Sequence, residues 1–337
     1  MVKFYKILFL NTLVLGTLIT ISSYSWFSMW IGLEMNLLSI LPLMVNHKNI
    51  YPSEAAMKYF ITQALASLIL LFTIIISMNF KEFIPQNSLN FLMMILNSSL
   101  FLKMGAAPFH AWFPEVMEGL NWTNGFILLT WQKIAPMVIL MYNLNMTMYL
   151  TWIIVISSVI GGLLGLNQVS LRKIMAYSSI NHIAWMLSSM MHFKTIWFFY
   201  FLVYTIISLS LIMIFDFYNI IYSNQLFLIF SSNKLISFLF SMNFLSLGGL
   251  PPFLGFLPKW LTVNSLINSQ FYWLTLILII TTLMTLYFYV RLTYAAFLLK
   301  KSEITMFLSL KNKFWMIFFN FCSLMGMIIC MLMMNFL

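Results

Sequence analysis

Runs of about 20 apolar residues follow one another along nearly the whole chain, and this pattern is compatible with few folds. A helix of this length satisfies its own backbone hydrogen bonds inside lipid. Only 7% of the residues are charged and 62% are hydrophobic, which no soluble core of this size requires. The sequence predicts an all-α polytopic membrane protein, a single domain over residues 1–337. Its eleven transmembrane helices fall near 7–24, 26–45, 56–79, 89–112, 122–144, 147–168, 175–192, 195–221, 234–257, 271–298 and 314–336.

The basic residues are unequally divided between the two sides of these helices. An odd number of crossings puts the termini on opposite sides, and only Lys81 and Lys194 fall on the C-terminal side. The positive-inside rule therefore places the N terminus in the cytoplasm or in an organelle's matrix. Lys3 and Lys6 before an apolar run also fit a signal peptide, but no small-residue cleavage site follows, which favours a retained helix. The N-terminal side carries Lys3, Lys6, Lys48, Lys58, Arg172, Lys173, Lys234, Lys300, Lys301, Lys311 and Lys313.

The composition argues against several classes of function. The net charge of +10 is spread too thinly among apolar runs to form a nucleic-acid groove, so no nucleic-acid partner is expected. The two cysteines, Cys322 and Cys330, lie eight residues apart in the last apolar run, which supports neither an iron-sulfur cluster nor a disulfide framework. No histidine has a second ligand at metal-binding spacing, so no metal site is expected.

Two of the apolar runs are interrupted by the same short pattern. GAAPFHAWFPEV at 105–116 returns as GLPPFLGFLPKW at 249–260, 144 residues later. Proline removes a backbone donor, and irregular backbone persists at membrane depth only where protein or a water-filled cavity covers it. Matching breaks in two halves are typical of a transport site. We therefore predict two repeats, about 89–221 with a broken helix at 89–112 and about 234–336 with a broken helix at 234–257.

Four charged residues inside or beside these helices are the main candidates for function, because a charge at the bilayer centre costs roughly 2.5–3.5 kcal/mol. They are Glu34, Lys103, Lys133 and Lys259. Such positions favour proton transfer, and each has a plainer alternative. Glu34 could form a static ion pair, and Lys133 could be held by carbonyls freed at Pro136. Lys103 could likewise be a buried lysine held by carbonyls, and Lys259 could extend to the interface.

Other polar residues lead to weaker expectations. His110 in the first break and His182 near the start of a helix could relay protons near neutral pH, or could be satisfied core histidines. Glu54 and Lys58 have the spacing of a surface ion pair on a helix. Asp216 and Arg291, toward the ends of long helices, could pair with each other or anchor to lipid headgroups.

Four segments in a fixed order carry a more specific resemblance. They are LKMGAAPFHAWFPEV at 102–116, LLTWQKIAP at 128–136, GLNQVSLRKIMAYSSI at 165–180 and LSLGGLPPFLGFLPKW at 245–260. Together they resemble the subunit 2 family of mitochondrial NADH dehydrogenase, antiporter-like membrane subunits of respiratory complex I. The length and the helix number are similar to the animal form of this family, and the Met and Phe bias is similar to insect mitochondrial proteins.

The resemblance implies an antiporter-like inverted repeat and proton translocation across the mitochondrial inner membrane. It implies that Glu34, Lys103, Lys133 and Lys259 form the relay, while His110 and His182 fall on family motif positions. It also implies that FMN, the iron-sulfur clusters and ubiquinone belong to other subunits, so that no cofactor is expected in this chain. The partners would be neighbouring antiporter-like subunits and lipids, with the N terminus in the matrix and the C terminus in the intermembrane space. A free-standing cation/proton antiporter and a purely structural scaffold remain as alternatives.

Overall fold

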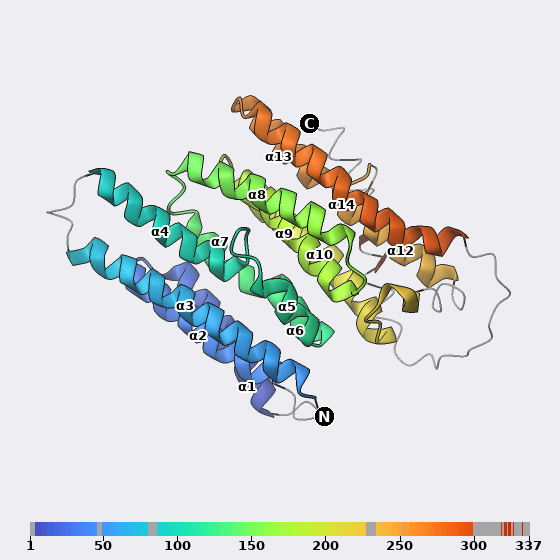
Figure 1. The fold of residues 1–337 in the computed structure, drawn as a ribbon, viewed down its shortest axis with the longest axis horizontal. Coiled ribbons are helices and arrows are strands. Elements are labelled where there is room, and N and C mark those ends of the chain that lie inside the picture. The colour runs from blue at the N-terminus through green and yellow to red at the C-terminus, as the bar shows by residue number, and fades with distance from the viewer. Residues whose placement is uncertain are drawn as a thin grey trace. The chain divides into compact units, whose positions relative to one another are not determined.

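The structure is a computed structural model that describes residues 4–45, 49–79, 86–226, 234–251 and 253–298, with scattered positions between 318 and 332. It divides into two compact units, Met1–Ile156 and Ser157–Leu337. Every regular element named along these residues is an α-helix (Figure 1). The predicted run near 314–336 lies almost entirely outside the described residues.

The described residues of the first unit form seven helices and the start of an eighth. Neighbouring helices pack in chain order, α1 on α2, α2 on α3 and α3 on α4 (Figure 1). The N terminus of α2 is capped by Ser25, whose Oγ accepts a hydrogen bond from the backbone N–H of Ser28 at 3.2 Å. The helices are α1 (Phe4–Ser22), α2 (Trp26–Met44), α3 (Tyr51–Asn79), α4 (Gln86–Met104), α5 (Trp112–Gly119), α6 (Trp122–Leu129), α7 (Trp131–Leu140) and α8 (Thr147–Leu166).

The second unit continues from α8. Within it, α9 and α10 pack together, α12 packs on α14, and α13 contacts α9, α10 and α14. The helices are α9 (Leu171–Met190), α10 (Lys194–Tyr218), α12 (Lys234–Gly248), α13 (Phe256–Asn268) and α14 (Tyr272–Leu298).

Six helices of the described residues are long and apolar enough to cross a bilayer, and two shorter apolar helices, Asn90–Met104 and Ser237–Gly248, precede the two breaks. The all-α membrane architecture is therefore confirmed, while the number of eleven crossings is not. Outside the two broken runs, the observed helices start and end within about five residues of the predicted runs, as is usual for boundaries read from hydropathy. In the broken runs, α4 ends at Met104 and α12 at Gly248, eight and nine residues before the predicted ends, and most of α13 lies beyond any predicted run.

One predicted helix is wrong in detail. The run at 122–144 is not continuous, because Thr130 (φ −117°, ψ −70°) separates α6 from α7. Thr130 donates to the carbonyl of Phe126 through both its backbone N–H, at 3.0 Å, and its Oγ1, at 2.7 Å. Pro136, which we expected to perturb this helix, lies inside α7. The interruption thus precedes Lys133 and does not follow it.

Helices α1 and α2 approach closely through small residues. A Cβ added at Gly32 would lie 2.5 Å from Cγ2 of Thr20 and 2.9 Å from the carbonyl oxygen of Gly16. Small residues at such positions let two backbones touch, and this contact replaces the hydrophobic effect as a source of helix association in lipid.

We expect Gly32→Ala to force α1 away from α2 and to lower the thermal unfolding midpoint of the protein in detergent. Gly162→Ala is the matched control, because a Cβ there would meet its nearest neighbour at 3.4 Å, an ordinary contact. Equal midpoints for the two variants would show that the close approach of α1 and α2 contributes nothing to stability.

Candidate functional site

The first break, residues 105–111, begins where α4 ends in a left-handed residue. Gly105 has φ +74°, which glycine adopts without steric cost. The N–H of Ala106 donates to the carbonyl of Phe101 at 3.0 Å, and the N–H of Gly105 donates to that of Leu102 at 3.3 Å. This is the hydrogen-bond pattern of a Schellman helix end. The chain then turns through the N–H of Phe109, which donates to the Ala106 carbonyl at 2.9 Å.

The second break, residues 249–255, repeats this pattern 144 positions later. Gly249 has φ +76°. Leu250 donates to Leu245 at 3.3 Å, Gly249 to Ser246 at 3.0 Å, and Phe253 to Leu250 at 2.9 Å. The structure therefore interrupts both helices where the sequence motif predicts, and it ends each of them with the same hydrogen-bond pattern and a glycine of positive φ. The extents of the two repeats stay predictions, and Pro252 lies outside the described residues.

The carbonyls at the end of α4 are satisfied by uncharged side chains. Trp112 donates from Nε1 to the Leu102 carbonyl at 3.1 Å, and Gln63 of α3 donates from Nε2 to the Lys103 carbonyl at 3.3 Å. Gln63 is 4% exposed. The first break is thus held from two sides, by α3 and by the residue that starts α5.

The corresponding end of α12 is held by a lysine. The Nζ of Lys259, on α13, donates to the carbonyls of Leu247 at 3.1 Å and Gly248 at 2.8 Å. The Leu247 carbonyl matches that of Lys103 in the motif alignment, so an ammonium replaces an amide. A cation is favoured at the negative end of a helix dipole. Because Lys259 is 7% exposed, the alternative that it extends to the membrane surface is wrong.

Lys103 and Glu34 interact across the first unit without touching. Lys103 lies on α4 and is 6% exposed, while Glu34 lies on α2. The negative charge of Glu34 acts on Lys103 through space. Within the described residues no hydrogen bond or ion pair joins the two side chains. The direct ion pair considered for Glu34 is therefore not present, and a longer-range attraction takes its place.

Lys133 is the most deeply buried of the three lysines. It is 1% exposed on α7, and its Nζ lies 5.3 Å from the centroid of the Phe113 ring. A cation over an aromatic face is stabilised by the ring quadrupole. Phe113 in turn packs against Gly105, where an added Cβ would lie 3.1 Å from the phenylalanine Cβ. Lys133 is therefore connected to the first break through one aromatic ring.

Two uncharged residues of α3 also lie close to the buried lysines and were not predicted from the sequence as part of the site. Tyr59 is 2% exposed and its hydroxyl donates to Oε1 of Gln132 at 3.3 Å, beside Lys133. Gln63, one turn further along, reaches the Lys103 carbonyl. Polar residues four apart in an apolar run share one helix face. That four-residue spacing could have indicated a polar helix face at the site. It was missed because only ionisable residues were considered as candidates.

The two histidines differ in their surroundings. His110 is half-buried, and its Nδ1 lies 3.2 Å from the carbonyl oxygen of Pro108 within the same break. His182 is 5% exposed on α9, and its Nδ1 lies 2.9 Å from the hydroxyl of Tyr200 on α10.

His182 faces a small cavity of the second unit. Tyr200, Ser246, Leu247 and Pro258 also line it, and about 10 Å³ is open to the centre of a water molecule. That volume is near the minimum for one water. Leu247, whose carbonyl accepts the hydrogen bond from Lys259, lines the same cavity as His182. The cavity therefore lies between the histidine and the end of α12 that Lys259 holds.

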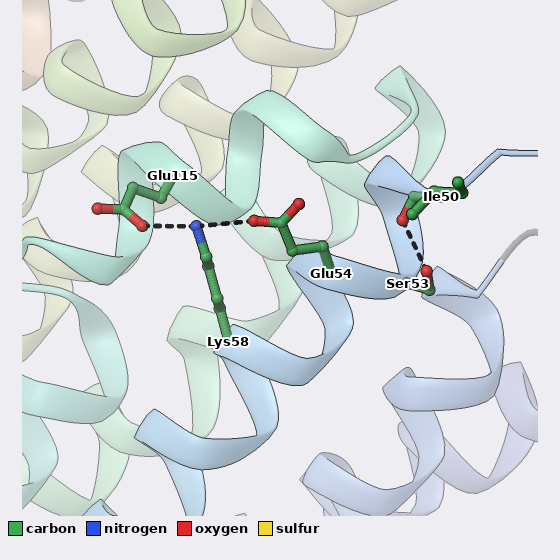
Figure 2. A network of polar contacts seen from close by, with 5 residues as sticks. All are labelled: Ile50, Ser53, Glu54, Lys58 and Glu115. Carbon is green, nitrogen blue, oxygen red and sulfur yellow. Dashed lines mark hydrogen bonds and ion pairs between the residues drawn. The ribbon is translucent and has the colours of Figure 1, made fainter.

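The surface of the first unit carries a three-residue ion cluster (Figure 2). The Nζ of Lys58 lies 3.2 Å from Oε1 of Glu54 and 3.0 Å from Oε2 of Glu115. The predicted pair of Glu54 and Lys58 is confirmed, and the contact with Glu115 additionally ties α5 to α3.

We expect Glu115→Gln to change the thermal unfolding midpoint very little. The Lys58 and Glu115 side chains are 45% and 57% exposed, and exposed pairs contribute little because water and salt screen them. A large loss of thermal stability, undiminished by added salt, would show that this cluster has a structural role beyond an exposed ion pair.

Comparison with known proteins identifies the class of membrane protein that this fold represents. Residues 23–285 match the family described as NADH:quinone oxidoreductase/Mrp antiporter, TM. The fold is also similar to a chain in the structure of respiratory complex I from Thermus thermophilus with bound aureothin, with a TM-score of 0.82 at 21% identity, covering 97% of this chain and 77% of that one.

Curated relatives narrow the assignment. The chain is 48% identical to NADH-ubiquinone oxidoreductase chain 2 of Anopheles gambiae, covering 97% of each sequence. It is 44% identical to the chain 2 protein of Locusta migratoria, covering 91% of this chain and 89% of that one. The chain therefore belongs to the NADH-ubiquinone oxidoreductase chain 2 family, and the resemblance to subunit 2 is confirmed.

Proposed function

We propose that this chain is a proton-translocating membrane subunit of NADH:ubiquinone oxidoreductase, respiratory complex I, in the mitochondrial inner membrane. Membership of the chain 2 family supports the assignment to this complex. The observation that carries the proton-transfer role is the burial of three lysines, Lys103, Lys133 and Lys259, at 6%, 1% and 7% exposure. Burying an ammonium is costly, so such residues mark ion pathways in membrane proteins.

The relay begins at Glu34. Redox chemistry in other subunits changes the charge near this carboxylate. That change alters the attraction between Glu34 and Lys103, and with it the free energy of protonating Lys103. At about 10 Å and an effective dielectric constant of about 20, one unit charge changes the energy of another by roughly 1.7 kcal/mol. A lysine already destabilised by burial needs only a change of this size to gain or release a proton.

Later steps use the other two lysines. Lys133 exchanges the proton with Lys103 in the first unit, and Lys259 then accepts and releases it in the second unit. The breaks contribute irregular backbone beside each station, and His182, on the water-sized cavity behind Leu247, is a further relay candidate. His110 has a weaker case, because its hydrogen bond stays within its own break.

The remaining features follow from the same assignment. FMN, the iron-sulfur clusters and ubiquinone belong to other subunits, in keeping with a chain that has two cysteines eight residues apart. The partners are neighbouring membrane-arm subunits and lipids. The N terminus faces the matrix and the C terminus the intermembrane space, as the distribution of basic residues indicates.

Replacement of Glu34 by glutamine tests the first link of the relay. We expect the assembled complex to form and to reduce quinone, with fewer protons moved per electron, because Glu34 makes no direct ion pair that assembly would depend on. Proton uptake by sealed vesicles and NADH oxidation are measured together. Glu54→Gln, a surface acid, is the control and is expected to leave the proton yield unchanged.

Two outcomes would favour the alternatives. A structural scaffold predicts that Glu34→Gln leaves the proton yield per electron unchanged. A free-standing antiporter predicts that the chain purifies alone and exchanges cations for protons without the other subunits.

A further inference from the structure

A polar pocket with room for a small headgroup lies at one end of the second unit, where three parts of the chain meet. The connection between α8 and α9 and the turn after α10 are joined by two hydrogen bonds, from the N–H of Leu171 to the Ile221 carbonyl at 2.9 Å and from the N–H of Ser223 to the Val169 carbonyl at 3.1 Å. The pocket beside them has a volume of about 380 Å³. Its polar lining consists of Asn167, Gln168, Ser223, Asn224 and Arg291.

Arg291 is the charged residue of this pocket and its guanidinium is held in place. Its Nη1 donates to the Leu166 carbonyl at 2.8 Å and its Nη2 donates to the Gln168 carbonyl at 3.2 Å. These two bonds engage two of the five N–H groups of the side chain. A planar fork that is already fixed loses little entropy on binding, and its geometry matches a phosphate.

The rest of the lining suits an anion. Among the described residues that line the pocket there is no carboxylate, so none of them neutralises the charge of Arg291. Asn167, Asn224 and Ser223 add amide and hydroxyl donors. The turn that carries Ser223 and Asn224 is itself fixed, because Oε1 of Gln225 accepts from the N–H groups of Ile221 at 2.7 Å and Tyr222 at 3.2 Å.

The neighbouring surface indicates a lipid. Tyr222 and Tyr294, on two of the elements that form the pocket, are 51% and 58% exposed, and exposed tyrosines in membrane proteins concentrate at headgroup level. Val169, Leu226 and Leu292 add an apolar part to the lining, which suits glycerol esters and the first methylenes of acyl chains. We propose that this pocket binds the phosphate headgroup of an anionic phospholipid through Arg291, with Asn167 and Asn224 as further donors.

The test uses the whole assembled complex in mild detergent and a photoreactive phosphatidylglycerol. Peptides containing 163–169 and 291–294 are expected to be labelled, and unlabelled phosphatidylglycerol is expected to compete. Arg291→Gln removes the charge, and Asn224→Leu fills the pocket while leaving the carbonyl bonds of Arg291 intact. Each is expected to weaken labelling about tenfold, the effect of losing one charge-assisted hydrogen bond. Lys173→Gln, a basic residue outside the lining, is expected to label like the native chain.

Three results would overturn the proposal. They are unchanged labelling in Asn224→Leu, equal competition by zwitterionic phosphatidylcholine, and full displacement by inorganic phosphate alone, which would make the occupant a free anion. If Arg291→Gln does not assemble because the end of α8 loses its cap, Asn224→Leu decides the question by itself.

Discussion

Lys259→Met is expected to stop proton transfer in the second unit and to destabilise the second break. The native ammonium satisfies the carbonyls of Leu247 and Gly248 at the end of α12. Methionine fills similar space without a donor, and each buried acceptor left without a partner costs about 1–3 kcal/mol. Part of this loss is offset, because an ammonium no longer has to be buried. We expect a lower thermal unfolding midpoint together with fewer protons moved per electron.

Lys259→Arg separates these two effects. Arginine keeps the charge and the donors for the two carbonyls but does not release a proton at working pH. We expect it to recover the thermal stability lost in Lys259→Met without recovering the proton yield. Recovery of both properties would show that Lys259 acts as a structural cap and takes no part in proton transfer.

Lys133→Met is expected to abolish proton transfer as well, but, unlike Lys259→Met, to leave the assembly of the complex intact. Lys133 is 1% exposed and lies over the Phe113 ring, so its replacement by an apolar chain of similar volume leaves a well-filled core. Exchanging a buried charge for such a residue is often neutral or stabilising. The amount of assembled complex, compared with that of the native chain, checks the first half of this expectation. A collapse of assembly would assign Lys133 a structural role.

Much of the fold follows from the sequence because membrane helices are set by length and composition. The runs near 7–24 and 26–45 appear as α1 and α2 with ends shifted by only a few residues. The breaks are equally predictable, since Gly105 and Gly249 precede proline-rich segments and supply the positive φ that ends each helix. Local chemistry decides both features.

The partners of the buried charges could not be derived in this way. Lys259 reaches carbonyls eleven and twelve residues away, while the matching carbonyl in the first unit takes its donor from Gln63, forty residues away. Which donor arrives depends on how neighbouring helices pack, and hydropathy carries no information about that. The hydrogen bond between His182 and Tyr200 is hidden for the same reason.

Gly255 shows a requirement that appears only in three dimensions. Its φ of −67° is open to any residue, and its counterpart in the first break is Ala111. Yet a Cβ at Gly255 would collide with the Ser246 carbonyl oxygen. The split between α6 and α7 at Thr130 is a second such case, because the sequence predicts one continuous run at 122–144 and Pro136, its strongest helix breaker, lies inside α7.

The proton yield of Lys133→Met tests the proton relay most directly. The assembled complex carrying this substitution is placed in sealed vesicles, and proton uptake is recorded together with electron transfer from NADH to quinone. Lys58→Met, which removes an exposed lysine of the same unit, serves as the control and should keep the native ratio. The relay predicts fewer protons per electron in Lys133→Met while quinone is still reduced. An unchanged ratio in that variant would contradict it.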